Sequence, residues 1–367
     1  MALFAYRATG SAFIVAMLTM LRVLPMGLFG VFIGAAADRF SPRSALVLGV
    51  AASMASTLAL AVLASLGMLQ VWHLALACFV NGINWATDNP VRRMMIGNAI
   101  GTERMGSAIS LDVAANNASR VLGPALGGVL LARYDIGSVF WLGVLMYGAS
   151  LFAALSVQMR GARAAGRADS MVDDIRKGFA WLSHDRRLVG VFIITVIFNI
   201  FGWSYTSMVP VIATGYFQLD PRGAGLLVGC EGAGGLIGVM LFARLGRPEW
   251  YGRIYLAATI MYFATIMGFA MAPVVPLAVL LLLVNGIGGV GFAVMQATLV
   301  YRYSPADMRG RLLGVLSVCI GAGPIGFMYL GFLADVFTPR AATLAIALQG
   351  MLALILTRRY WTPLVRA

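Results

Sequence analysis

The feature that constrains this chain most is a recurring apolar segment of about 20 residues, the length of α-helix that crosses a lipid bilayer. Short polar stretches separate these segments. A soluble chain needs about 25% charged residues, whereas only 11% of this one is charged. We therefore predict an all-α integral membrane protein with eleven spans at 11–36, 44–68, 72–95, 104–132, 136–158, 188–214, 222–245, 251–273, 275–300, 311–336 and 339–358.

The net charge is +13, and the positive residues are concentrated in every second loop. Alternate loops hold 21 of the 27 lysines and arginines, whereas the loops between them hold only Arg7, Arg133, Arg222 and Arg340. Loops rich in Lys and Arg stay on the cytoplasmic side of a membrane. The pattern predicts a multi-pass inner-membrane protein with a cytoplasmic C-terminus, and the charge gives no reason to expect a nucleic-acid partner.

Residues that hold metals or carry out catalysis are scarce. Cys78, Cys230 and Cys319 all fall in apolar segments, without the paired spacing of a disulfide or metal site. His73 and His184 lie in or near different loops, on opposite sides of the predicted membrane. We therefore expect no metal, no cofactor and no enzymatic activity.

The two ends of the chain are related by an internal repeat. Four pairs of identical residues recur at an offset of 200: Gly123 and Gly323, Pro124 and Pro324, Leu130 and Leu330, and Asp135 and Asp335. Duplicated halves are typical of secondary transporters. We predict an N-terminal helical bundle at 1–158 and a C-terminal six-helix bundle at 188–367. The polar stretch at 159–187 is predicted to be a cytoplasmic linker with an amphipathic helix.

The repeat also bears on the start of the chain. The helix that begins near Leu188 has its counterpart 200 residues earlier, before Met1. We therefore expect that most of the first of twelve helices is missing through a truncated or misassigned start. A genuine eleven-helix protein is the alternative.

The loop after the first complete segment reads GAAADRFSPR from Gly34. It resembles the signature loop of the major facilitator superfamily, although serine and proline stand where a glycine and a basic residue are usual. The resemblance implies a conformational latch in which Asp38, with Arg39 and Arg43, holds neighbouring helices together in one state. A charged loop that merely follows the positive-inside rule is the alternative.

Four further motifs are similar to one branch of that superfamily, the enterobactin-exporter-like and macrolide-efflux-like proteins. They are LRVLP at 21–25, DNPVR at 88–92, ASRVLGP at 118–124 and RGR at 309–311. The resemblance implies a monomer of two six-helix bundles around a central cavity that opens alternately to each side. It also implies proton-coupled efflux of a small drug-like or siderophore-like molecule.

Glu231 is the clearest candidate for coupling. It follows Asp220 by 11 residues and precedes Arg244 by 13, which places it about 16–20 Å from either end of its helix. An ionisable group at such depth is costly and marks a functional site by default, and burial favours the neutral acid. The alternative is a protonated glutamic acid that only packs between helices.

Three polar residues spaced by four, Asp112, Asn116 and Arg120, share one face of a helix. Arg120 lies near the middle of the membrane and needs a counter-charge, from Asp112, Glu231 or an anionic substrate. A structural role for Arg120 beside the Gly-Pro bend is the alternative. Asp88 and Arg92 are predicted to form a stabilising pair.

Helices that line the cavity in the family carry further polar and aromatic candidates: Asn81, Asn84, Asn199, Trp203, Tyr205, Asn285 and Gln296. Proton-coupled exporters of the superfamily often have an arginine four residues before a glycine of the fourth helix. Here Gly82 corresponds to that glycine, and Cys78 stands at the arginine position. The usual proton-relay arginine is therefore absent, and this motif does not establish proton coupling. Nutrient uptake is an alternative to export, because the residues do not indicate direction, and the missing first helix makes an inactive truncated transporter another.

Overall fold

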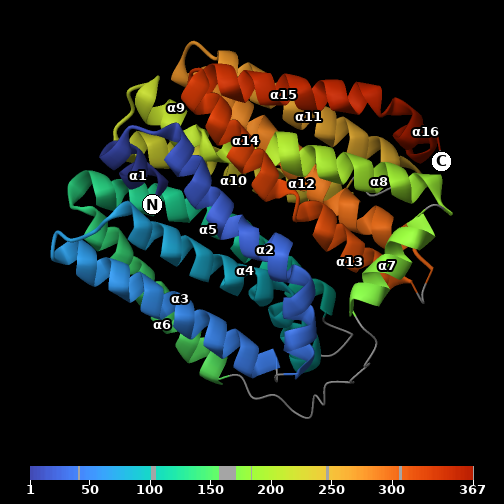
Figure 1. Cartoon of the computed structure of the whole chain (residues 1–367), viewed down its shortest axis with the longest axis horizontal. Coiled ribbons are helices and arrows are strands. Elements are labelled where there is room, and N and C mark those ends of the chain that lie inside the picture. Colours follow the sequence, from blue (N-terminus) through green and yellow to red (C-terminus); the bar gives the residue numbers. More distant parts are fainter. Residues whose placement is uncertain are drawn as a thin grey trace.

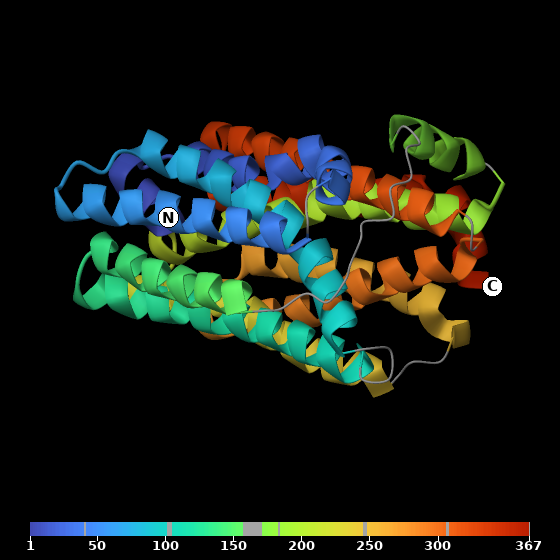
Figure 2. The ribbon, with the colours of Figure 1, turned by 90° about the horizontal axis from the view of Figure 1, so that it is seen from below.

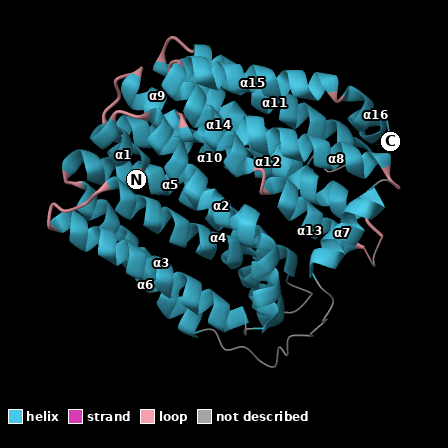
Figure 3. Ribbon diagram, in the orientation of Figure 1, coloured by secondary structure: helices cyan, strands magenta, loops and turns pink. Residues whose placement is uncertain are grey.

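The computed structural model describes residues 1–39, 42–100, 105–156, 171–182, 184–244, 248–305 and 308–366, and every regular element in these ranges is a helix (Figure 3). The α-helices in chain order are α1 (Ala2–Thr9), α2 (Ala12–Arg39), α3 (Pro42–Ser65), α4 (Val71–Ile100), α5 (Met105–Arg133), α6 (Ile136–Ser156), α7 (Met171–Leu182), α8 (Arg186–Ile197), α9 (Val209–Gly215), α10 (Pro221–Arg244), α11 (Tyr251–Met271), α12 (Val275–Tyr303), α13 (Arg309–Ile320), α14 (Gly323–Val336), α15 (Pro339–Leu356) and α16 (Arg358–Arg366).

Among the described residues, eight helical segments are long and apolar enough to cross a membrane: Arg43–Ser65, Ile136–Ser156, Arg186–Gly215, Pro221–Phe242, Tyr251–Met271, Val275–Tyr303, Arg309–Val336 and Pro339–Leu356. Each of the eleven predicted apolar segments overlaps at least one helix. The prediction of an all-helical membrane protein is confirmed, whereas the number of crossings stays a prediction.

The helices form two groups, α2–α6 and α8–α15 (Figure 1). Helices α7 and α16 lie at one end of the molecule, which we call the α7 end, and α1 and α9 lie at the other, the α9 end; Figure 2 shows the same separation from below. The groups meet where α5 packs on α10 and α2 packs on α14.

Glycines permit the close approach of the two groups. A Cβ atom added at Gly225 of α10 would lie 2.3 Å from the Pro124 carbonyl oxygen of α5. At Gly27 of α2, an added Cβ would lie 2.7 Å from the carbonyl oxygen of Gly321. Small residues let helix backbones touch where lipid supplies no hydrophobic driving force. The two groups are therefore in contact from the α9 end to about the middle of the long helices.

The predicted segment 188–214 is not one regular helix. Between α8 and α9 the chain passes through a π-helix, η1 (Phe198–Gly202), and a 3₁₀-helix, η2 (Trp203–Ser207). Side chains compensate carbonyl groups there: Asn199 donates to the Thr195 carbonyl (2.8 Å) and Ser204 to the Ile200 carbonyl (3.1 Å). Irregular turns inside a membrane helix are tolerated when such groups are satisfied, and they occur frequently at functional sites.

Candidate functional site

An ion pair links the two groups near mid-helix. Arg120 of α5 places Nη2 3.1 Å from Oε1 of Glu231 on α10. The Glu231 side chain is 15% exposed and that of Arg120 is 51% exposed. A Cβ at Gly232 would lie 3.0 Å from the carbonyl carbon of Arg120, so the missing side chain at position 232 allows α5 to come this close. The structure therefore gives Arg120 the counter-charge that its position requires.

The second carboxylate oxygen of Glu231 belongs to a buried polar chain. The Tyr205 hydroxyl of η2 lies 3.0 Å from Glu231 Oε2 and 2.7 Å from Asn285 Oδ1 of α12. Asn285 Nδ2 donates to the Tyr262 carbonyl (3.1 Å) and to Thr265 Oγ1 (2.9 Å). Tyr205 is fully buried and Asn285 is 1% exposed. One predicted cavity residue, Tyr205, thus contacts the predicted coupling residue, and a second, Asn285, is linked to it through the Tyr205 hydroxyl.

An aromatic pair also bridges the groups. The rings of Trp85 on α4 and Trp203 on η2 have centroids 6.0 Å apart at 45°. On its other side, Trp203 contacts the ring of Phe327 edge-on, with centroids 5.7 Å apart. The faces of indole rings are apolar and suit an aromatic or amphipathic ligand. The sequence prediction included Trp203 and missed Trp85, which lies one helical turn beyond Asn81.

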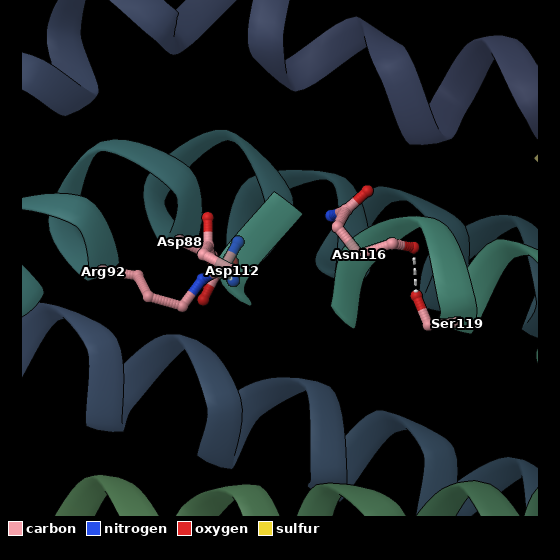
Figure 4. Close-up of polar contacts among 5 residues, drawn as sticks. All are labelled: Asp88, Arg92, Asp112, Asn116 and Ser119. Atoms are coloured by element: carbon pink, nitrogen blue, oxygen red, sulfur yellow. Dashed lines mark hydrogen bonds and ion pairs between the residues drawn. The ribbon is translucent and has the colours of Figure 1, made fainter. Parts of the chain in front are cut away.

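Asp112 has a different partner from the one that its helical stripe suggests. Arg92 Nε donates to Asp88 Oδ2 at 3.1 Å, and Arg92 Nη1 donates to Asp112 Oδ1 (Figure 4). The Asp112 side chain is 5% exposed. Asn116 lies one turn further along α5, where its carbonyl accepts from Ser119 Oγ at 2.7 Å (Figure 4). The predicted Asp88–Arg92 pair is confirmed, and the counter-charge of Arg120 is Glu231.

The remaining cavity candidates lie within one group or the other. The Tyr147 hydroxyl donates to Asn81 Oδ1, which ties α6 to α4. Asn84 packs against Gly49 of α3. These side chains join helices of the first group.

Asn199 and Gln296 belong to the core of the second group. Asn199 Nδ2 donates to the Thr195 carbonyl at 2.8 Å, and Gln296 Nε2 donates to Thr195 Oγ1 at 2.9 Å. Tyr255 adds its hydroxyl 3.0 Å from the same Thr195 oxygen. These contacts hold α8, α11 and α12 together.

Most of the predicted latch lies outside the described side chains. The side chains of Gly34, Asp38 and Arg39 are among those that the structure does not describe. Arg43 is described, and its guanidinium donates to the Leu155 carbonyl at the end of α6. The latch stays a prediction.

A cavity of about 660 Å³ lies at the α9 end, away from Glu231, between α1, α9, α11 and α15. Its charged residue, Arg340, donates to the carbonyl groups of Ala270 (2.7 Å) and Ala272 (3.1 Å), and its guanidinium lies 3.7 Å above the Tyr216 ring. Arg340 therefore satisfies carbonyl groups at the C-terminus of α11, which is a structural role.

The family described as transmembrane secretion effector, a branch of the major facilitators, matches residues 5–366 of this chain. The chain belongs to this family of major facilitator transporters. It is thus a membrane transporter and not an enzyme, and the predicted family is confirmed.

Relatives and solved structures agree with that assignment. The multidrug efflux pump Tap of Mycolicibacterium fortuitum is 25% identical over 95% of this chain and 88% of its own length. The staphyloferrin A transporter of Staphylococcus aureus is 21% identical over 86% of this chain and 79% of its own length. A mutant of the nucleoside transporter NupG has the same fold, with a TM-score of 0.71 and 14% identity over 95% of this chain and 91% of that one.

Proposed function

We propose that this transporter exports a small amphipathic organic molecule, drug-like or siderophore-like, across the inner membrane in exchange for protons. Relatives with similar sequences are named as a multidrug efflux pump and a staphyloferrin A transporter, which supports such a substrate. The concentration of Arg and Lys in alternate loops supports a cytoplasmic α7 end and an external α9 end.

The observation that carries the proposal is the Arg120–Glu231 pair between α5 and α10, at 3.1 Å. The ionised carboxylate attracts the guanidinium, and the attraction is stronger inside a membrane protein than in water because the local dielectric constant is low. A proton on Glu231 removes that charge. Proton binding thus weakens one of the contacts that hold the two groups together near mid-membrane.

Exchange follows if proton and substrate compete for the same group. A substrate amine or other hydrogen-bond donor that reaches Glu231 replaces the proton, while its apolar part stacks on Trp85 and Trp203. Two ligands that exclude each other from one site are transported in opposite directions by alternating access. The same competition explains why export needs no separate proton relay at the Cys78 position.

Glu231→Gln tests the proposal, because glutamine has the shape of the neutral acid and binds no proton. In proteoliposomes with an imposed pH gradient, the variant is expected to lose gradient-driven transport of ethidium, used as an amphipathic cationic probe, while it elutes as a folded monodisperse protein. Glu249→Gln, at an exposed acidic residue outside the membrane spans, is the matched control and is expected to transport like the parent. Gradient-driven transport by Glu231→Gln at the parental rate would refute the coupling role.

A further inference from the structure

The Tyr205 hydroxyl has more acceptors than it has hydrogens. It lies within hydrogen-bond distance of two oxygens, Glu231 Oε2 at 3.0 Å and Asn285 Oδ1 at 2.7 Å. A phenol has one hydrogen to donate and also accepts through its oxygen. An ionised carboxylate and an amide oxygen are acceptors only, so Tyr205 donates its hydrogen to one of these two oxygens at a time.

Rotating the Asn285 amide by 180° does not remove this conflict between acceptors. Its Nδ2 donates to the Tyr262 carbonyl at 3.1 Å and to Thr265 Oγ1 at 2.9 Å. A flipped amide would place its oxygen against the Tyr262 carbonyl oxygen, where two acceptors repel each other. Asn285 therefore presents its oxygen to Tyr205.

A proton on Glu231 resolves the conflict. The neutral acid donates from Oε2 to the Tyr205 oxygen, and Tyr205 then donates to Asn285 Oδ1, so two hydrogen bonds form in series. When the proton leaves, Tyr205 turns its hydrogen to the carboxylate, and Asn285 Oδ1 loses its donor. Ionisation therefore strengthens the contact with Arg120 and costs the buried amide a hydrogen bond, and the two effects oppose each other.

We propose that Tyr205 and Asn285 are positioning residues for the coupling proton: they hold it on the Oε2 side of Glu231 and increase the fraction of neutral acid at a given pH. The inference deepens the proposed function and rests on it for its consequence in transport. The other groups that act on Glu231 within the described chain are Arg120 of α5 and the Tyr262 phenol of α11. Helix α12 faces it with Gly286, which carries no titratable group.

The test uses infrared spectroscopy of the purified full chain in lipid nanodiscs, without any substrate. The carbonyl-stretch band of neutral Glu231, identified by its loss in Glu231→Gln, is titrated with pH. Asn285→Leu removes the amide oxygen, which stabilises only the neutral form, so the midpoint is expected to fall by about 0.7 pH unit, a fivefold effect from one neutral hydrogen bond. Asn285→Ala is expected to give the same shift and serves if the leucine variant does not fold.

A double-mutant cycle separates positioning from a general structural role. In the Tyr205→Phe background no hydroxyl connects position 285 to Glu231, so Asn285→Leu is expected to leave the midpoint unchanged there. Gln296→Leu is the matched control, because Gln296 lies on the same helix, is 5% exposed and donates to Thr195. It is expected to leave the midpoint at the parental value.

Three outcomes would overturn the proposal. One is an equal shift for Asn285→Leu with and without the Tyr205 hydroxyl, and another is no shift in either background. The third is the absence of a titrating Glu231 band over the pH range in which the protein stays folded. The measurement requires no transport. A midpoint shift for Asn285→Leu that occurs only when the Tyr205 hydroxyl is present would therefore support the positioning role even if Glu231→Gln retained gradient-driven transport.

Discussion

Replacing Gly225 with alanine is expected to separate α5 from α10 at the α9 end. The added Cβ would lie 2.3 Å from the Pro124 carbonyl oxygen and 3.1 Å from the Gly128 Cα atom. Relaxed contacts between heavy atoms are about 3.5 Å, so one helix must retreat by about 1 Å. The clash is with backbone atoms on both counts, and no rotation of a flexible side chain relieves it.

The expected size of the effect follows from measurements on tightly packed interiors, where an extra methyl group costs about 1–3 kcal/mol. The alanine acts against the conformation in which α5 and α10 touch, so its cost changes the ratio of closed to open molecules at this end by about 5–150-fold. The protein is expected to remain folded, because the clash lies between α5 and α10 and leaves the other helix contacts of each group in place.

Pulsed electron paramagnetic resonance between labels at Arg133→Cys and Arg222→Cys measures this separation. Both positions are exposed at the α9 ends of α5 and α10, in a background without the three native cysteines. Gly123→Ala is the matched control, since an added Cβ there meets no atom within 4 Å. Gly225→Ala is expected to lengthen the label separation and Gly123→Ala to leave it unchanged. An unchanged distribution in Gly225→Ala, or an equal change in both, would refute the reasoning.

Two further predictions concern stability. Asp112→Asn removes a buried carboxylate that pairs with Arg92, so the variant is expected to lose about 1–3 kcal/mol in denaturant unfolding. Asn116→Ala, one turn away at an exposed position, is the control and is expected to lose little. At the start of α6, the backbone N–H and the hydroxyl of Ser138 donate to Asp135 and hold the pKa of this carboxyl below its usual range. The ionised cap therefore stabilises the fold above the pKa of the unfolded state, and the stabilisation is lost as pH falls through the lower pKa of the folded state. Asp135→Ala is expected to lower the melting temperature at neutral pH and to change it less in acid. A difference in melting temperature that does not depend on pH would contradict this.

The positions of the helices and the depth of Glu231 could be predicted from the sequence, because each depends on a single segment of the chain. Apolar runs of bilayer length placed the helices, since backbone groups inside a membrane must bond within their own segment. Residue counting along one helix placed Glu231 at mid-depth, and the cost of an isolated charge there implied a partner for Arg120. Each of these inferences needs only the geometry of a single helix.

The choice of partner needs the packing of two helices that are far apart in the sequence. From the sequence, either Asp112 or Glu231 could supply the counter-charge of Arg120. The close contact of Arg120 with Gly232 decides between them. The sequence contains the glycines of α10, but it does not say which helix approaches them. Asp112 instead meets Arg92 because α4 and α5 are neighbours.

Little in the sequence indicates the irregular turns of η1 and η2. Proline, the residue that usually interrupts a membrane helix, is absent from residues 198–207, although Gly202 is followed by three hydroxyl side chains that bond back to carbonyl groups. The break brings Trp203 toward Trp85 and Tyr205 toward Glu231. Because a uniform helix was expected over 188–214, the contact of Trp85 with Trp203 could not be foreseen.

The central claim is that a proton on Glu231 releases the link between the two groups of helices. Pulsed electron paramagnetic resonance between Arg133→Cys and Arg222→Cys, recorded across a pH series, tests it most directly. The account predicts that the separation in the parent grows as pH falls, and that Glu231→Gln shows the larger separation at every pH. An equal response to pH in the parent and in Glu231→Gln, or no response in the parent, would contradict it.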